Sequence, residues 1–179
     1  ILPSGGKSAW KNPYQDVIDS SSYYEAVCYV TEKGLMNGTS ASTFSPDAAM
    51  TRAMMVTILW RMEKEPAAPK SQLTGLTADS YPTAVYLAAE TRVVNRVGNG
   101  KFAPNATLSL EQLITILYRY AENKGYNVSK SASLDSFTDG SAVSAYARPA
   151  MQWAVGMNFL SGNTLTPGAP ASRAQIAQV

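Results

Sequence analysis

Two arginines stand at positions where a helix is expected to begin. Arg52 and Arg173 each follow a hydroxyl residue, Thr51 or Ser172, of the kind that caps a helix N-terminus. The free backbone N–H groups at such an end attract anions, and an adjacent guanidinium adds a planar clamp for a carboxylate or a phosphate. These four residues therefore have the chemistry of an anion site.

An arginine in the first helical turn also works against the helix dipole, which indicates that it has a partner. One alternative is an ion pair within the chain, with an aspartate such as Asp16, Asp47 or Asp139. The other is an anionic ligand that the arginine shares with such residues. The local pattern leaves both alternatives open.

The pattern around these arginines occurs three times, with a period of about sixty residues. An apolar residue, a proline and a hydroxyl residue precede a helical pattern in TFSPDAAMTRAMMVTILWRM, KFAPNATLSLEQLITILYRY and TLTPGAPASRAQIAQV. A shorter helical segment lies upstream in each copy: YYEAVCYVTEKGLMNG, PTAVYLAAETRVVNR and RPAMQWAVGMNFLSG. Each copy therefore predicts a helix, a Gly/Asn-rich loop, a proline turn and a second helix.

A single pair of such helices has one apolar face and cannot bury it alone, whereas three pairs can share one core. We therefore expect an all-α fold, a pseudo-threefold arrangement of three helix–loop–helix repeats around a central helical bundle. The expected segments are an N-terminal extension at 1–13 and repeats at 14–63, 73–123 and 137–179, together one compact domain. By analogy with the first repeat, the last helix should extend beyond Val179.

Composition excludes several classes of function. Of the 179 residues 45% are hydrophobic, and the net charge of +2 comes from scattered lysines and arginines, which disfavours nucleic-acid binding. No apolar stretch approaches the ~20 residues needed for membrane insertion. With no histidine and one cysteine, Cys28, the chain lacks the ligands of the usual zinc sites and the base of an imidazole triad. We expect no cofactor and no metal.

The residues GLMNGTSASTFSPDAAMTRA, at 34–53, resemble the signature of an S-layer homology repeat, which runs G-x-x-x-G, F-x-P and TRAE. FTDGSAVSAYARPAMQWAV opens the third copy in the same style, and the second copy rests mainly on FAPNATLSLEQ. The resemblance covers roughly residues 14–179. It implies a non-catalytic anchoring module that binds secondary cell-wall polysaccharide, often through a pyruvylated amino-sugar, in grooves between repeats.

The ketal carboxylate of that sugar would be the anion that the helix starts attract. The resemblance further implies an extracellular location on the surface of a Gram-positive-type bacterium, and a monomeric pseudo-trimer. Carried over residue by residue, it assigns ligand binding to the early aspartates, the loop glycines, the helix-start residues and one groove aromatic: Asp16, Gly38, Thr51, Arg52, Asp139, Tyr146, Gly162, Ser172 and Arg173.

The second copy departs most from this pattern. Leu110 stands where the other copies have arginine, and a glutamate is displaced to Glu111. Serines, Ser22 and Ser80, stand where the family's groove tryptophan falls in the first two copies. We therefore expect one functional groove, or two, with none as the remaining case.

Two other functions are compatible with the sequence. The fold could serve as a structural or protein-interaction module that has lost its glycan, as the missing tryptophans and Leu110 would allow. A glycosidase acting through paired carboxylates is a third reading, with Asp16 and Asp19 or Asp135 and Asp139 as the pair. Aspartates this close together in loops more often form turns, so we do not expect an enzyme.

Overall fold

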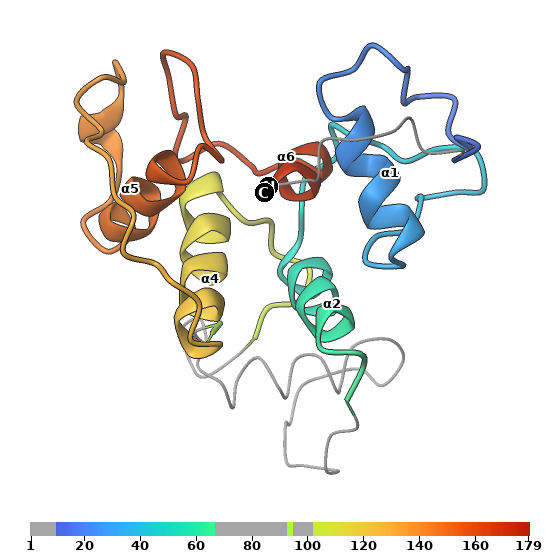
Figure 1. Cartoon of the computed structure of the whole chain (residues 1–179), viewed down its shortest axis with the longest axis horizontal. Coiled ribbons are helices and arrows are strands. Elements are labelled where there is room, and N and C mark those ends of the chain that lie inside the picture. The colour runs from blue at the N-terminus through green and yellow to red at the C-terminus, as the bar shows by residue number, and fades with distance from the viewer. Residues whose placement is uncertain (1–9, 67–92, 95–101) are drawn as a thin grey trace. The chain divides into compact units, whose positions relative to one another are not determined.

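The computed structural model describes residues 10–66, 93–94 and 102–179. In this part of the chain the expected all-α class is confirmed (Figure 1), with α1 (Tyr24–Glu32), α2 (Arg52–Met62), α4 (Leu110–Asn123), a 3₁₀ turn η2 (Gly140–Ala142), α5 (Arg148–Gly156) and α6 (Arg173–Gln178). The first helix expected in repeat 2 falls almost wholly outside the described residues. Two compact units make up the chain: unit 1 is Ile1–Ala49 with Ser172–Val179, and unit 2 is Met50–Ala171.

Both units pair helices from different repeats. In unit 1, α1 of repeat 1 packs against α6 of repeat 3 (Figure 1). In unit 2, α4 of repeat 2 packs against α5 of repeat 3. The second helix of one repeat thus buries its apolar face on the first helix of another. Fully buried apolar side chains in the two units include Val27, Phe44, Met55, Leu113, Ile114 and Met151.

Hydroxyl caps begin the second helix of every repeat, as the sequence predicts. The Thr51 side chain accepts a hydrogen bond from the Met54 N–H at the start of α2. Ser109 and Ser172 form complete capping boxes with glutamines, Gln112 in α4 and Gln175 in α6. Each cap satisfies one of the N–H groups that a helix leaves free at its start.

The first two N–H groups of each of these helices donate to the proline turn of another repeat. In α2, Arg52 N–H donates to the Ala106 carbonyl and Ala53 N–H to the Pro104 carbonyl, both at 3.0 Å. The equivalent pairs are Leu110 to Ala169 and Glu111 to Pro167 in α4, and Arg173 to Ala48 and Ala174 to Pro46 in α6. Repeat 1 therefore uses the turn of repeat 2, repeat 2 that of repeat 3, and repeat 3 that of repeat 1.

The residue before the proline has a left-handed backbone in every turn, although none is glycine. The φ angles are 57° at Ser45, 52° at Ala103 and 50° at Thr166. Such a conformation costs a non-glycine residue about 1–2 kcal/mol. The turn must therefore be held from outside.

An aspartate near the start of the repeat holds the turn. Asp16 accepts the N–H groups of Phe44, at 2.8 Å, and Ser45, at 2.7 Å, one on each carboxylate oxygen. Asp139 binds repeat 3 in the same way, at 2.8 Å from Leu165 N and 2.7 Å from Thr166 N. The aspartates fix the strained residue and its neighbour together.

Left-handed residues also end the helices. Gly34 after α1 and Gly125 after α4 have φ of 66° and 72°, where glycine carries no steric penalty. At the corresponding place after α2 stands Lys64, with φ of 62°. Its N–H donates to Arg61 and that of Glu65 to Trp60, the two bonds that close the same kind of terminus.

The first prediction concerns this terminus. Lys64→Gly relieves the steric cost and is expected to stabilise the chain by about 0.5–1 kcal/mol in urea unfolding, after the entropy cost of glycine. Lys33→Gly is the matched control, because Lys33 caps α1 with φ of −80° and should lose about 0.5–1 kcal/mol. Equal destabilisation by both changes would contradict the prediction.

The second prediction is acid sensitivity through Asp139. The N–H groups of Leu165 and Thr166 hold the pKa of Asp139 below its ordinary value of 3.8. A carboxyl group whose pKa is lower in the folded than in the unfolded chain stabilises the fold. This contribution is fully present above the unfolded pKa and is lost as pH falls through the folded pKa. Asp139→Asn should therefore unfold at lower urea at pH 7, with the gap narrowing below about pH 4. Asp135→Asn, in the same loop, should follow the wild type at both pH values.

Candidate functional site

Arg173 is held by the loop and turn of repeat 1. Its side chain is only 6% exposed. Nε donates to the Phe44 carbonyl at 2.8 Å and Nη2 to the Asn37 carbonyl at 2.6 Å. The guanidinium also lies over the Phe44 ring, 4.6 Å from its centroid, in a cation–π contact.

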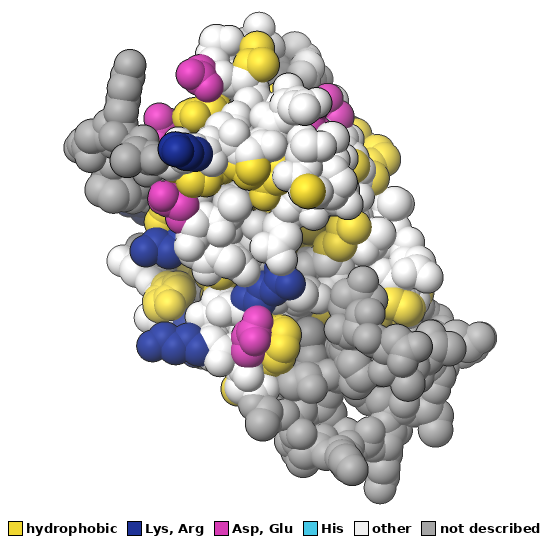
Figure 2. All heavy atoms as spheres, turned by 90° about the vertical axis from the view of Figure 1, so that its right-hand side faces the viewer, with side chains coloured by type: hydrophobic (Ala, Val, Ile, Leu, Met, Phe, Trp, Pro, Cys, Tyr) yellow, Lys and Arg dark blue, Asp and Glu magenta, His cyan; other side chains and the backbone are white. Residues whose placement is uncertain are grey.

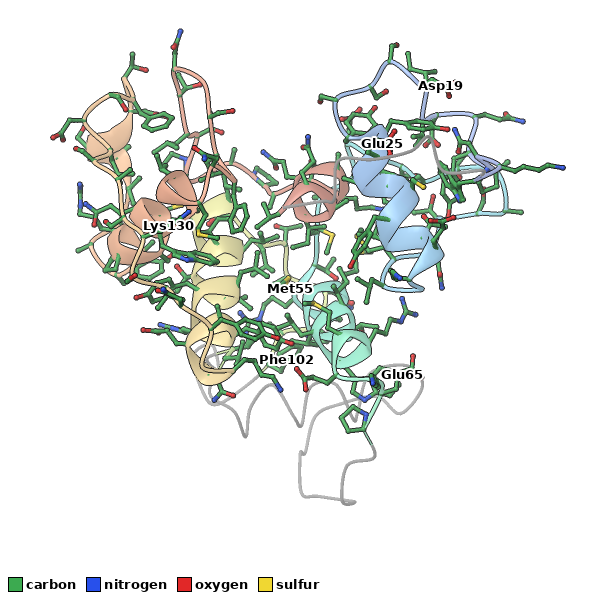
Figure 3. All side chains as sticks on the ribbon, in the orientation of Figure 1. Asp19, Glu25, Met55, Glu65, Phe102 and Lys130 are labelled. Carbon is green, nitrogen blue, oxygen red and sulfur yellow. The ribbon has the colours of Figure 1, made fainter. Side chains whose placement is uncertain are left out.

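Arg52 repeats this geometry on the turn of repeat 2. Its Nε donates to the Phe102 carbonyl at 2.7 Å, and its guanidinium lies 5.0 Å from the centroid of the same ring, labelled in Figure 3. Desolvation lowers the pKa of both arginines, Arg52 and Arg173. Their ordinary pKa is so high that both stay charged at neutral pH.

Where α4 meets the turn of repeat 3, both residues of the arginine–phenylalanine contact are replaced. Leu110 in α4 replaces the arginine, and the turn that α4 meets has Leu165 in place of phenylalanine. Both leucines are buried. We call the place where a second helix meets the proline turn of another repeat a junction. Arginine and phenylalanine occur together in the junctions of α2 and α6, and both are absent from the junction of repeats 2 and 3, which α4 forms.

The aspartates expected as partners of the arginines have a different role. Both oxygens of Asp16 and of Asp139 bind turn N–H groups. Asp16 acts on Arg173 through space, raising its pKa against the effect of burial. Within the described residues, however, no carboxylate lies within ion-pair distance of Arg173. Its direct partners are two carbonyls and a ring.

The loop glycines satisfy steric requirements. A Cβ on Gly38 would lie 2.5 Å from the Ser40 carbonyl oxygen and 2.6 Å from Cε1 of Tyr14, so no larger residue fits. Gly162 has φ of 105°, which side chains rarely adopt. Gly38 follows Asn37, whose carbonyl receives Arg173, so this glycine shapes the loop that binds the arginine.

Tyr146 lies in the turn before α5 and is 52% exposed. Its OH donates to Oε1 of Glu111 at 3.2 Å. Burial and the Glu111 charge raise the pKa of Tyr146, so the phenol is a proton donor at neutral pH. Sequence reasoning noted Glu111 only as a displaced glutamate and missed this contact. The available signal was that the other repeats have alanine, Ala53 and Ala174, at this place.

Comparison with known proteins identifies the repeats. The family model of the S-layer homology domain matches residues 13–54, 76–114 and 136–177, three tandem copies over more than half of the chain. The chain belongs to this family. As an S-layer homology domain it is a cell-surface anchoring module, and the three matches confirm that it contains three tandem repeats.

Curated relatives carry similar segments. An endoglucanase of Bacillus sp. (strain KSM-635) is 30% identical over 93% of this chain, and the surface-layer 125 kDa protein of Lysinibacillus sphaericus is 26% identical over 87%. A cell surface protein of Thermoanaerobacter kivui is 29% identical over 60%. The chain spans less than a fifth of each relative, namely 18%, 13% and 15%.

Charged side chains are spread over the face of this S-layer homology domain that Figure 2 shows. On this face, lysines and arginines lie among acidic and uncharged side chains and form no continuous basic patch. No described helix is long and apolar enough to cross a membrane. Among the same residues, acidic, cysteine and histidine side chains form no group of three or more suited to a metal ion.

The third prediction tests the arginine contact. Arg173→Lys keeps the charge but loses the Nε and Nη2 geometry and the flat guanidinium over Phe44. It should destabilise the domain by about 1–3 kcal/mol in urea unfolding. Arg148→Lys, at the start of α5, is the matched control and should change stability by less than about 0.5 kcal/mol. Similar values for the two variants would show that the contact contributes nothing specific.

Proposed function

We propose that this S-layer homology domain anchors its parent protein, without catalysis, by binding an anionic secondary cell-wall polysaccharide in grooves between repeats. The proposed ligand carries a pyruvylated amino-sugar, and the proposed setting is the wall of a Gram-positive-type bacterium. Arginine-containing junctions, with Arg52 and Arg173, are the proposed anion sites. Around these sites the loops and helix starts are fixed by Thr51, Ser172, Gly38 and Asp16. Gly162 and Asp139 fix the loop and turn of repeat 3, at the junction without arginine.

The charge state of Arg173 carries the proposal. A buried guanidinium is costly unless opposite charge compensates it. Here the direct partners, two carbonyls and a phenyl ring, supply only dipoles, and the charge of Asp16, whose oxygens bind the turn, reaches the guanidinium only through space. A ligand carboxylate would add a direct charge-assisted contact through the remaining N–H groups of the guanidinium.

Tyr146 belongs to the junction of repeats 2 and 3, which lacks the arginine. Its half-exposed ring offers a surface on which the apolar face of a sugar can stack. We propose that this ring adds a stacking contact that does not hold the glycan by itself, whereas the ionic contact is made at the other junctions. One or two working grooves per chain follow from this division.

Three equivalent repeats at pseudo-threefold positions, forming one monomeric domain, are also part of the proposal. The support is the order of the helix-start contacts, from repeat 1 to 2, 2 to 3 and 3 to 1. Each contact uses the same two N–H groups and the same two places in the turn. A cyclic order of equivalent contacts is what a closed threefold arrangement requires.

A structural or protein-interaction module without a glycan is the second candidate. The leucines of the repeat 2–3 junction, Leu110 and Leu165, favour it, because that junction has lost the arginine and its ring. A folded chain that fails to bind any wall preparation would support this candidate. The glycosidase reading is weaker, because Asp16 and Asp139 each use both oxygens on the turn.

The fourth prediction tests wall binding by co-sedimentation. The purified chain should sediment with Gram-positive wall that carries its secondary polymer and stay in solution with wall stripped of it. Arg52→Leu and Arg173→Leu, which import the residue of repeat 2, should each weaken sedimentation about tenfold or more, because a charge-assisted contact is lost.

Controls separate binding from folding. Arg148→Leu removes an equal charge outside the two arginine-containing junctions and should bind like the wild type. Circular dichroism at the assay temperature checks that every variant is folded. Equal binding of the wild type to intact and stripped wall would rule out the secondary polymer as the ligand.

A further inference from the structure

Glu111 is a buried carboxylate that receives three hydrogen bonds from one short segment. It is 8% exposed. Oε2 accepts the Ser144 N–H at 2.9 Å, and Oε1 accepts the Ser144 Oγ–H at 2.7 Å and the Tyr146 O–H at 3.2 Å. Two residues of the segment that leads into α5 thus surround the end of a side chain from α4.

The donors match the two oxygens of a carboxyl group. One oxygen takes two hydroxyl donors and the other a backbone N–H, so both oxygens are used as acceptors, which the nitrogen of an amide cannot match. Arg119 acts through space on Tyr146 and lowers its pKa against the other effects, so positive charge lies near as well. Removing the carboxylate would leave these donors without an acceptor.

The other repeats lack this internal acceptor. Alanines, Ala53 and Ala174, stand at the place of Glu111 in α2 and α6. Repeat 1 has Ser20 where repeat 3 has Ser144, and Ser20 is exposed. Glu111 therefore occurs only in the junction that has also lost the arginine and the phenylalanine.

We propose that Ser144 and Tyr146 form a carboxylate-binding site whose occupant in this chain is its own Glu111. The site takes a carboxylate of any small organic anion once Glu111 is shortened. In the native chain Glu111 closes the junction of repeats 2 and 3 to the carboxylate of a wall glycan, a consequence that rests on the proposed function. Leu110 and Leu165 line the same junction, which therefore offers a wall glycan no arginine and no open carboxylate site.

The fifth prediction uses acetate to probe the emptied site. Glu111→Ala introduces alanine, the residue that α2 and α6 have at the equivalent position. Sodium acetate should raise the melting temperature of this variant saturably, by about 2–4 °C over sodium chloride of equal ionic strength. The wild type, whose site is filled, should show no difference between the two salts.

Two further variants locate the effect. Glu111→Ala combined with Tyr146→Phe lacks one donor and should need several-fold more acetate for the same shift. Glu111→Ser serves if Glu111→Ala is poorly folded, because its hydroxyl can accept one hydrogen bond and still leaves room for acetate. Absence of an acetate-specific shift in a folded Glu111 variant, or an equal shift in the wild type, overturns the proposal.

A separate glycan-binding experiment tests whether Glu111 closes the junction of repeats 2 and 3. With a soluble pyruvylated fragment of the wall polymer, calorimetry should find one more binding site per chain in Glu111→Ala than in the wild type. If the fragment binds neither protein, the proposed function fails while the acetate result still decides the carboxylate site. An acetate shift with an unchanged number of glycan sites would limit Glu111 to a structural occupant and overturn its role in closing the junction.

Discussion

The free N–H groups at the start of a helix must find acceptors, and in this domain those acceptors come from another repeat. The second helices of all three repeats donate their first two N–H groups to carbonyls of a proline turn that belongs to a different copy. A buried N–H without an acceptor costs more than a typical hydrogen bond contributes. Each of these helices therefore depends on the position of the turn whose carbonyls accept its first N–H groups.

Around the turn of repeat 1 the motif residues form one connected structure centred on Phe44. Asp16 binds its N–H, Arg173 binds its carbonyl, and the Arg173 guanidinium covers its ring. The aspartate, the F-x-P turn and the arginine that define the family signature therefore act on the same residue. In repeat 3, Asp139 still holds Leu165, but α4 supplies Leu110, and the ring is gone together with the cation.

Much of this architecture was predictable from the sequence, because it depends on spacing and on side-chain type. The three repeats, the hydroxyl caps and the helical class follow from the positions of Thr51, Ser109 and Ser172 and from the apolar pattern after them. Family membership followed from the F-x-P and TRA residues. Each of these features depends on which residue type stands at a given position.

The partners of Arg52 and Arg173 could not be predicted in the same way. Their acceptors are backbone carbonyls, which every residue possesses and no sequence pattern marks. The left-handed conformation of Ser45 and Thr166 was hidden for a related reason, since the aspartates that bind their N–H groups are distant in sequence. Glu111 was visible as a departure from the repeat, but its acceptor role depends on how α4 meets the segment before α5.

The pairing of helices across repeats separates two units of organisation that usually coincide. The segment copied along the chain contains a first helix, a turn and a second helix. The packed pair contains the second helix of one copy and the first helix of another, α4 with α5 or α6 with α1. The inherited module and the structural module are thus offset by half a repeat. Removing one copy would therefore disrupt both junctions in which that copy takes part.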